Sequence, residues 1–304
     1  DFAPGRLAST GQHRFDVRSR RAQALAHRLL ATAALMARLH TELVGSGRPR
    51  FAFLPGLLGR GRNWTQIAQE LAGQDLPSVL FDLPNHGQSS WTESFSYTQM
   101  ADAVAADIDL RLGSAAELVL VGHSMGGKVA MLTALHHPEL VSGLAVVDIA
   151  PGQSGQVGTF TPLVAAMQGL DLGTLGSRAD ADARLRVAVP DEDVRLFLLQ
   201  NLRRRGGWHW QPNLALLEAN LDVIGDWPDP GAGPYRGPVR WLTGAHSPYV
   251  GASDEAPMRA LFPAVRRVVV PDSGHWVQAD QPEAVVAELV DLARESGLRP
   301  RPPT

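Results

Sequence analysis

The sequence predicts an α/β fold, in which a mostly parallel sheet is flanked by helices and an inserted helical cap interrupts the sheet. In residues 39–150, short apolar runs alternate with longer helical stretches. This alternation is typical of parallel strands joined by crossover helices. The alternation stops at Pro151 and sheet-like runs return near residue 239. We therefore expect a core made of 39–150 and 231–304, with the cap at 151–230.

Residues 39–44 and 51–54, with a Gly-Ser-Gly turn between them, predict a hairpin that leads into a buried strand. Asn63 stands where it would cap the N-terminus of a helix over 63–72, whose apolar residues recur with helical spacing. The cap shows helical stretches at 194–202 and 213–224 and no clear buried strand. The remaining core elements expected are strands at 78–82, 118–121, 144–149, 239–243 and 266–270, and helices at 100–112, 126–136 and 283–294.

Composition excludes several classes of protein. The chain has 304 residues, 44% of them hydrophobic, and a formal net charge of -3, which does not fit a basic nucleic-acid binder. It has no cysteine, so disulfides, thiolate catalysis and cysteine-ligated zinc are excluded. The longest nearly apolar stretch, 29–37, is far shorter than the roughly 20 residues of a membrane span. We expect no nucleic-acid partner and no membrane span.

The first 38 residues form a basic arm, with seven arginines against two aspartates. Residues 20–39 are rich in alanine and leucine and predict a helix. We expect this helix to pack on the domain, with a transit peptide as the alternative. The start shows no export-signal pattern, so a cytoplasmic location is expected.

The segment Gly122-His123-Ser124-Met125-Gly126 fits the Gly-x-Ser-x-Gly pattern of a nucleophile elbow. An apolar strand precedes it and a helix follows it, as the motif requires. The flanking glycines matter because a strand that reverses into a helix at the serine leaves no room for side chains beside it. Ser124 is therefore the expected nucleophile.

A serine nucleophile needs a histidine base and an acid that orients the base. His275 follows the strand at 266–270 and is late enough for the order serine, acid, histidine, with His246 as the fallback. The acid has to be sought elsewhere than at its usual position, because Ser247 stands where an aspartate is common. Asp148, at the end of strand 144–149, is the expected acid, and Asp254 is the alternative.

Two backbone amides should stabilise the oxyanion, one after the nucleophile and one in the loop after an earlier strand. Met125 and Leu57 occupy those positions. The cap should restrict the acyl group, because Trp208 and Trp210 supply aromatic bulk that either walls a crevice over Ser124 or only packs the cap. The complete set of residues expected to contact substrate is His123, Asn85, Trp208, Trp210, Tyr249 and Trp276.

The chain resembles the α/β-hydrolases, and within them the small bacterial esterases related to mitochondrial α/β-hydrolase-domain proteins. The resemblance spans about 39–295 and leaves out the arm. It implies hydrolysis of short-chain carboxylic esters, and thioesters as a second acyl class, with a small-molecule substrate and no cofactor or metal. The stretches that carry it are Asn85-His86-Gly87, 121–131, 147–151, 247–250 and Gly274-His275-Trp276.

Two other functions stay open at this point. One is a carbon–carbon lyase of the menaquinone-pathway type, which shares the elbow and uses the serine and histidine as a base pair. The other is a non-catalytic receptor or interaction protein on the same fold, which usually has a broken triad. Every triad position can be filled here, and this favours an enzyme. The oligomeric state does not follow from the sequence.

Overall fold

The computed structural model describes residues 38–113 and 117–298. In these residues a seven-stranded sheet has the order β1-β3-β2-β4-β5-β8-β9. β1 runs antiparallel to β3 and every other pair in this sheet is parallel, which confirms the predicted mostly parallel sheet. The predicted basic arm lies, up to residue 37, outside the described residues. The strands are β1 (His40–Val44), β2 (Phe51–Leu54), β3 (Ser78–Asp82), β4 (Val119–His123), β5 (Gly143–Val147), β8 (Val239–Gly244) and β9 (Val265–Val270).

The predicted hairpin between the first two strands is wrong. β1 pairs with β3, with His40 opposite Asp82, and β2 lies between β3 and β4. Every residue of β2 is buried, and both of its edges are taken by parallel neighbours. The outer edge of β3 is therefore the place left for β1, and the Gly-Ser-Gly turn only redirects the chain.

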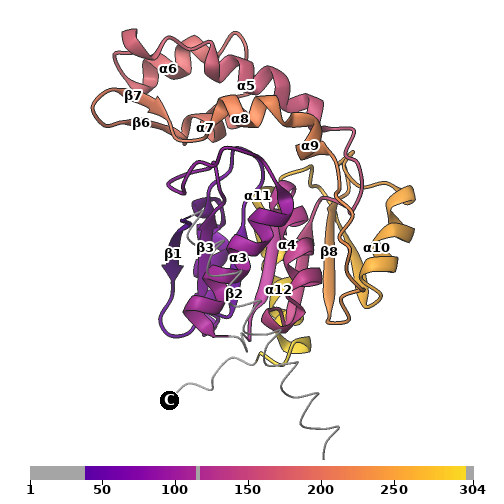
Figure 1. The fold of residues 1–304 in the computed structure, drawn as a ribbon. Coiled ribbons are helices and arrows are strands. Elements are labelled where there is room, and N and C mark those ends of the chain that lie inside the picture. The colour runs from indigo at the N-terminus through magenta and orange to yellow at the C-terminus, as the bar shows by residue number, and fades with distance from the viewer. Residues whose placement is uncertain (1–37, 114–116, 299–304) are drawn as a thin grey trace, which may run out of the picture.

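Helices cover both faces of the sheet (Figure 1). The buried apolar side chains form two cores. α3 (Tyr97–Leu112) and α4 (Met125–His136) cover one face and contact each other. α2 (Thr65–Ala72) and α12 (Pro282–Glu295) cover the other face. The short helices α10 (Glu255–Leu261) and α11 (Val277–Asp280) follow β8 and β9. No helix in the described part of the chain is long and apolar enough to cross a membrane.

Asn63 does not cap the helix that the sequence predicted there. A single 3-10 turn, η1 (Gly61–Trp64), precedes α2, and Trp64 occupies the N-cap position. The Asn63 side chain instead accepts a hydrogen bond from the Arg60 backbone N–H at 2.6 Å. The 3-10 turn thus begins two residues before Asn63, and the α-helix begins only at Thr65.

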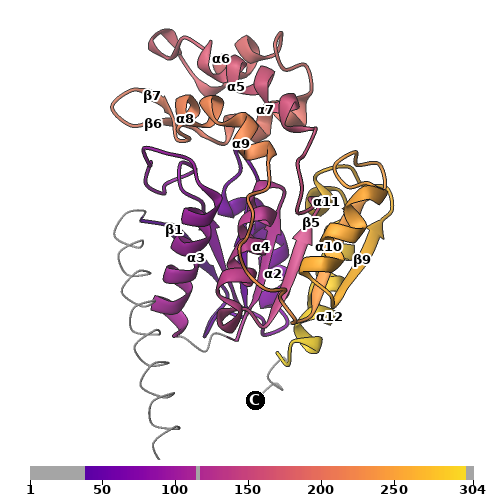
Figure 2. The ribbon, with the colours of Figure 1, turned by 45° about the vertical axis from the view of Figure 1, so that its right-hand side comes forward.

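The cap lies as a separate layer over the carboxyl ends of the core strands (Figures 1 and 2). It contains a hairpin that the sequence did not predict, β6 (Leu202–Arg204) and β7 (Trp208–Trp210), joined by a turn in which Gly206 and Gly207 have positive φ. Each strand has only three residues, with two arginines in β6 and a histidine in β7, so neither appears in the sequence as a buried apolar run. The cap helices are α5 (Thr161–Gln168), α6 (Arg178–Leu185), α7 (Glu192–Leu199), α8 (Leu214–Ala219) and α9 (Leu221–Gly225).

Candidate active site

Ser124 lies at the turn between β4 and α4, where the strand reverses directly into the helix. Its backbone has φ 52° and ψ -122°, a left-handed φ that non-glycine residues rarely adopt. A Cβ placed on Gly122 would lie 2.2 Å from the Gly126 carbonyl oxygen, and one on Gly126 would lie 2.4 Å from the Pro55 carbonyl oxygen. The elbow therefore requires glycine on both sides of the serine.

Gly126→Ala is expected to destabilise the protein by about 1–3 kcal/mol, because the new methyl group meets backbone atoms that cannot move aside. Thermal unfolding followed by circular dichroism measures the effect. Gly155→Ala is the matched control, since a Cβ there meets no atom within 4 Å. Equal melting temperatures for the two variants would contradict this account of the elbow.

His275 lies on the loop that follows β9, and Asp148 lies directly after β5. The His275 Nδ1 atom is 2.7 Å from Asp148 Oδ2. Because an ionised carboxylate only accepts hydrogen bonds, Nδ1 carries the proton and Nε2 of the neutral ring keeps its lone pair. Nε2 is buried and has no hydrogen-bond partner among the described residues. The ring is thus oriented with a free proton acceptor.

Asp148 is completely buried and its carboxylate accepts three hydrogen bonds. The donors are His275 Nδ1, the Gly244 backbone N–H at 2.9 Å and the Ser247 hydroxyl. Charge-assisted bonds of this kind stabilise a buried anion. The alternative acid, Asp254, instead accepts a bond from the Gly251 N–H in the turn that leads into α10.

Ser247 has a role that the sequence alone did not reveal. It stands at the loop position after β8 where an acid is common, and its hydroxyl donates to Asp148 from the neighbouring strand. The same oxygen accepts a bond from the Tyr249 N–H at 3.2 Å. The one hint of this role in the sequence was that a serine occupies the position where the acid is usually found.

Leu57 and Met125, the residues expected to stabilise an oxyanion, both line the space around Ser124. Met125 is the first residue of α4, so its N–H has no acceptor inside the helix. The close contact between Gly126 and the carbonyls of Leu54 and Pro55 brings the loop that carries Leu57 to the start of the helix. The two amides belong to adjacent backbone segments beside the serine.

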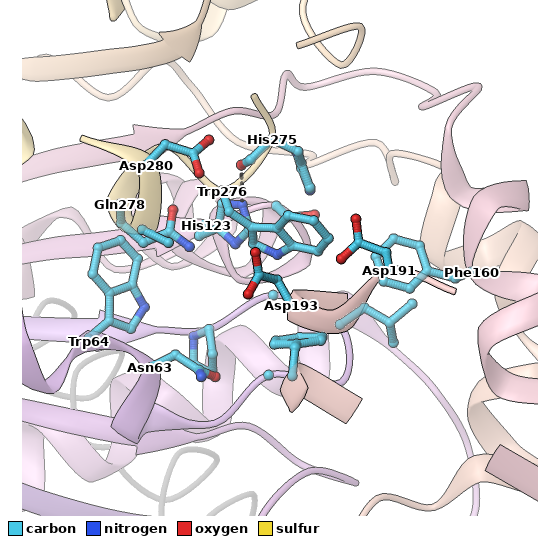
Figure 3. Close-up of a pocket in the computed structure, with 17 residues that line it drawn as sticks. Asn63, Trp64, His123, Phe160, Asp191, Asp193, His275, Trp276, Gln278 and Asp280 are labelled. Carbon is cyan, nitrogen blue, oxygen red and sulfur yellow. Dashed lines mark hydrogen bonds between the residues drawn. The ribbon is translucent and has the colours of Figure 1, made fainter. Parts of the chain in front are cut away.

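His123 supports the loop that carries His275. Its Nε2 lies 2.8 Å from the His275 carbonyl oxygen, and since a carbonyl only accepts, Nε2 is the donor (Figure 3). Burial, together with the neighbouring His275, lowers the pKa of His123 well below its ordinary value. His123 is therefore neutral at pH 7 and does not compete with His275 for a proton.

A cavity of about 550 Å³ opens beside Ser124 between the core and the cap (Figure 3). Ser124, His275 and His123 line it, as does Trp276, another of the expected contacts. The cap contributes Phe160, Asp191, Asp193 and Phe197. Phe160, at the end of the 3-10 turn η3 (Val157–Phe160), was not singled out by the sequence. A volume of this size holds a small organic molecule.

The structure corrects the expected positions of two tryptophans. Trp208 donates from Nε1 to the Leu175 carbonyl at 2.9 Å, and Trp210 donates to the Met167 carbonyl at 2.8 Å. Neither residue lines either of the cavities at Ser124, so both pack the cap. They are two residues apart on one strand, so they share a face of the hairpin, and both rings pack into the apolar core that the cap shares with one face of the sheet.

Asn85, another expected contact, does not line either cavity at Ser124. It is completely buried, and its side chain exchanges hydrogen bonds with Thr92 at 2.8 and 2.9 Å. Its carbonyl accepts a bond from the Asn213 N–H at the start of α8. Asn85 therefore joins the loop after β3 to the cap. Tyr249, by contrast, stacks on the His275 ring with centroids 3.5 Å apart.

Comparisons with known proteins identify relatives that cover most of the chain. The alpha/beta hydrolase family matches residues 51–289. An sn-1-specific diacylglycerol lipase, ABHD11 of Mus musculus, is 37% identical over 241 residues, covering 77% of this chain and 78% of its own length. The esterase YbfF of Escherichia coli is 29% identical over 77% of this chain and 89% of its own length. The solved structure of a marine microorganism esterase has a TM-score of 0.79 at 31% identity and covers 84% of this chain and 98% of its own.

Proposed function

Since this chain belongs to the alpha/beta hydrolase family and is a carboxylesterase-type hydrolase, we propose that it cleaves short-chain carboxylic esters through an acyl-enzyme on Ser124. One observation carries the proposal. The buried Asp148 carboxylate orients the His275 ring, whose Nε2 has no partner among the described residues, and His275 and Ser124 line the same cavity. Thioesters have the same acyl chemistry and are the second substrate class.

In the first half of the proposed reaction, Ser124 Oγ attacks the ester carbonyl carbon while its proton passes to His275 Nε2. The carbonyl oxygen becomes an anion and accepts hydrogen bonds from the Leu57 and Met125 amides. Asp148 stabilises the imidazolium that forms. The intermediate then collapses, the carbon–oxygen bond to the alcohol breaks, and His275 returns the proton to the departing oxygen.

In the second half, water replaces the alcohol. His275 Nε2 takes a proton from the water as it attacks the acyl-enzyme, and the same amides hold the new oxyanion. Collapse of this intermediate releases a carboxylic acid and restores the Ser124 hydroxyl. The route needs no cofactor and no metal.

The names of the relatives support ester substrates in general. A diacylglycerol lipase and esterases both act on carboxylic esters, but they leave the length of the acyl chain open. The filled triad positions favour this chemistry over a non-catalytic role on the same fold. A carbon–carbon lyase would use the same serine and histidine. The two functions must therefore be distinguished by experiment.

The test combines turnover with covalent labelling. We expect the purified protein to hydrolyse p-nitrophenyl acetate and butyrate, and a fluorophosphonate probe to label Ser124 and block that turnover. Labelling without turnover of any ester would contradict ester hydrolysis and favour the lyase. Turnover that survives complete labelling of Ser124 would remove the serine from the mechanism.

A further inference from the structure

A second, smaller cavity also touches Ser124. Its volume is about 20 Å³, and it shares Leu57, Ser124 and Phe160 with the larger cavity. His275 and Trp276 do not line it. Its remaining walls include Met125 and Lys128 from α4, Val157 from η3, and Ile224 and Gly225 from the end of α9.

The reaction geometry assigns the two cavities to the two halves of an ester, and this step rests on the proposed function. The departing alcohol oxygen must face His275 Nε2, which returns the proton to it. Because His275 lines only the larger cavity, the alcohol lies there. The oxyanion faces the Leu57 and Met125 amides, which line the smaller cavity next to Ser124. The acyl carbons take the direction that is left, into the rest of that cavity toward Val157 and Ile224. That cavity holds about one water-sized group.

Lys128 fixes one wall of this acyl cavity. It lies four residues after Ser124 on α4, is 1% exposed, and is the only lysine in the chain. Its Nζ donates to the carbonyl oxygens of Gly225 at 2.8 Å and Asp226 at 2.6 Å, with that of Ile224 at 3.4 Å. These carbonyls end α9 and have no partners inside the helix. A compact ammonium with three donors suits such converging carbonyls, whereas a planar guanidinium does not.

The junction around the lysine leaves little room for movement. Tyr97 Oη also donates to the Ile224 carbonyl, at 2.6 Å, and its ring lies 5.7 Å from Lys128 Nζ. A Cβ on Gly225 would lie 2.7 Å from Val157 Cγ1, so α9 packs directly on η3. Burial lowers the pKa of Lys128 to about 8, which leaves the group mainly charged at pH 7.

We propose that Lys128 determines the acyl chain length by holding the end of α9 against the cavity beside Ser124. The held wall restricts the acyl group to about two carbons, the carbonyl carbon and one methyl group in the cavity, while the larger cavity accepts alcohols of varied size. Lys128 acts here as a specificity-determining and positioning residue, because it reaches the substrate only through the wall that it holds.

The test measures kcat/KM for two series of esters. One keeps the p-nitrophenyl group and lengthens the acyl chain from acetate to hexanoate, and the other keeps the acetyl group and lengthens the alcohol. We expect at least a roughly 10-fold fall along the acyl series, since one methylene against a full pocket is worth about 10- to 200-fold. The alcohol series should stay within about 3-fold. The opposite pattern would overturn the assignment of the cavities.

Variants then test the wall itself through the hexanoate-to-acetate ratio of kcat/KM. Ile224→Ala shortens the wall and Lys128→Met releases it, so each should raise the ratio at least about 10-fold. The ratio is taken on one sample, so any unfolded fraction cancels. Leu289→Ala, a buried change in α12 on the other face of the sheet, is the control for general destabilisation. It should leave the ratio within about 2-fold.

Lys128→Met takes one donor from the Ile224 and Gly225 carbonyls, which keep Tyr97 Oη and the Ser154 N–H, and it also removes the donor to the Asp226 carbonyl, so it risks misfolding. Tyr97→Phe provides a milder release of the Ile224 carbonyl. We expect it to raise the ratio by about 3-fold. An unchanged ratio in Tyr97→Phe and in folded Lys128→Met, alongside a raised ratio in Ile224→Ala, would overturn the role of Lys128. Absence of Ser124 labelling and of turnover with every ester would instead reject the proposed function.

Discussion

Ser124→Ala is expected to lower kcat/KM for p-nitrophenyl acetate by at least about 1000-fold. The covalent route is then lost, and only substrate binding and the oxyanion amides remain. Steady-state hydrolysis by purified protein measures the change, with the variant prepared separately from the wild type to avoid traces of active enzyme.

The variant should keep its fold, because alanine differs from serine by one oxygen atom. A residue of similar size then occupies the left-handed backbone position of the elbow. An unchanged melting temperature, within a few degrees, is the control. A folded variant that loses less than 10-fold of its activity would reject Ser124 as the nucleophile.

Asp148→Asn is expected to lower turnover by about 100- to 10,000-fold, by analogy with loss of the acid in other triads. The Asn oxygen can still accept the bond from Gly244 N–H, and its amide nitrogen then faces His275 Nδ1. An amide donor there favours the ring tautomer with the proton on Nε2, which cannot accept the proton of Ser124.

Asp254→Asn is the comparison, because this side chain accepts a bond from the Gly251 N–H, which an Asn oxygen can replace. We expect it to change turnover by less than about 10-fold.

Ser247→Ala removes one of the three donors to Asp148, so its loss of turnover should lie between those of Asp254→Asn and Asp148→Asn. Turnover numbers on folded proteins rank them. A larger loss in Asp254→Asn than in Asp148→Asn would move the acid to the later loop, and mild losses in both would indicate a serine–histidine dyad.

The sequence alone predicted the parallel core and the elements at which the expected triad residues lie. Strands such as β4 and β5 are buried on both faces, so they appear in the sequence as uninterrupted apolar runs. A glycine-flanked serine between such a run and a helix is typical of a nucleophile elbow. These signals are local in the chain. The choice of His275 followed from the order of the segments, and the structure brings it to 2.7 Å from Asp148.

Only the tertiary structure decided which segments meet. β1 pairs with β3 because both edges of β2 are already occupied. The residues of β1 give no sign of which strand will be its partner. Ser247 reaches Asp148 because β5 and β8 are neighbours in the sheet. The tryptophans of the cap hairpin pack into the apolar core shared with the sheet, and Lys128 on α4 reaches the end of α9 almost a hundred residues away along the chain. Burial and donor–acceptor pairing between distant segments fix these contacts, and a local pattern of side chains carries no information about either.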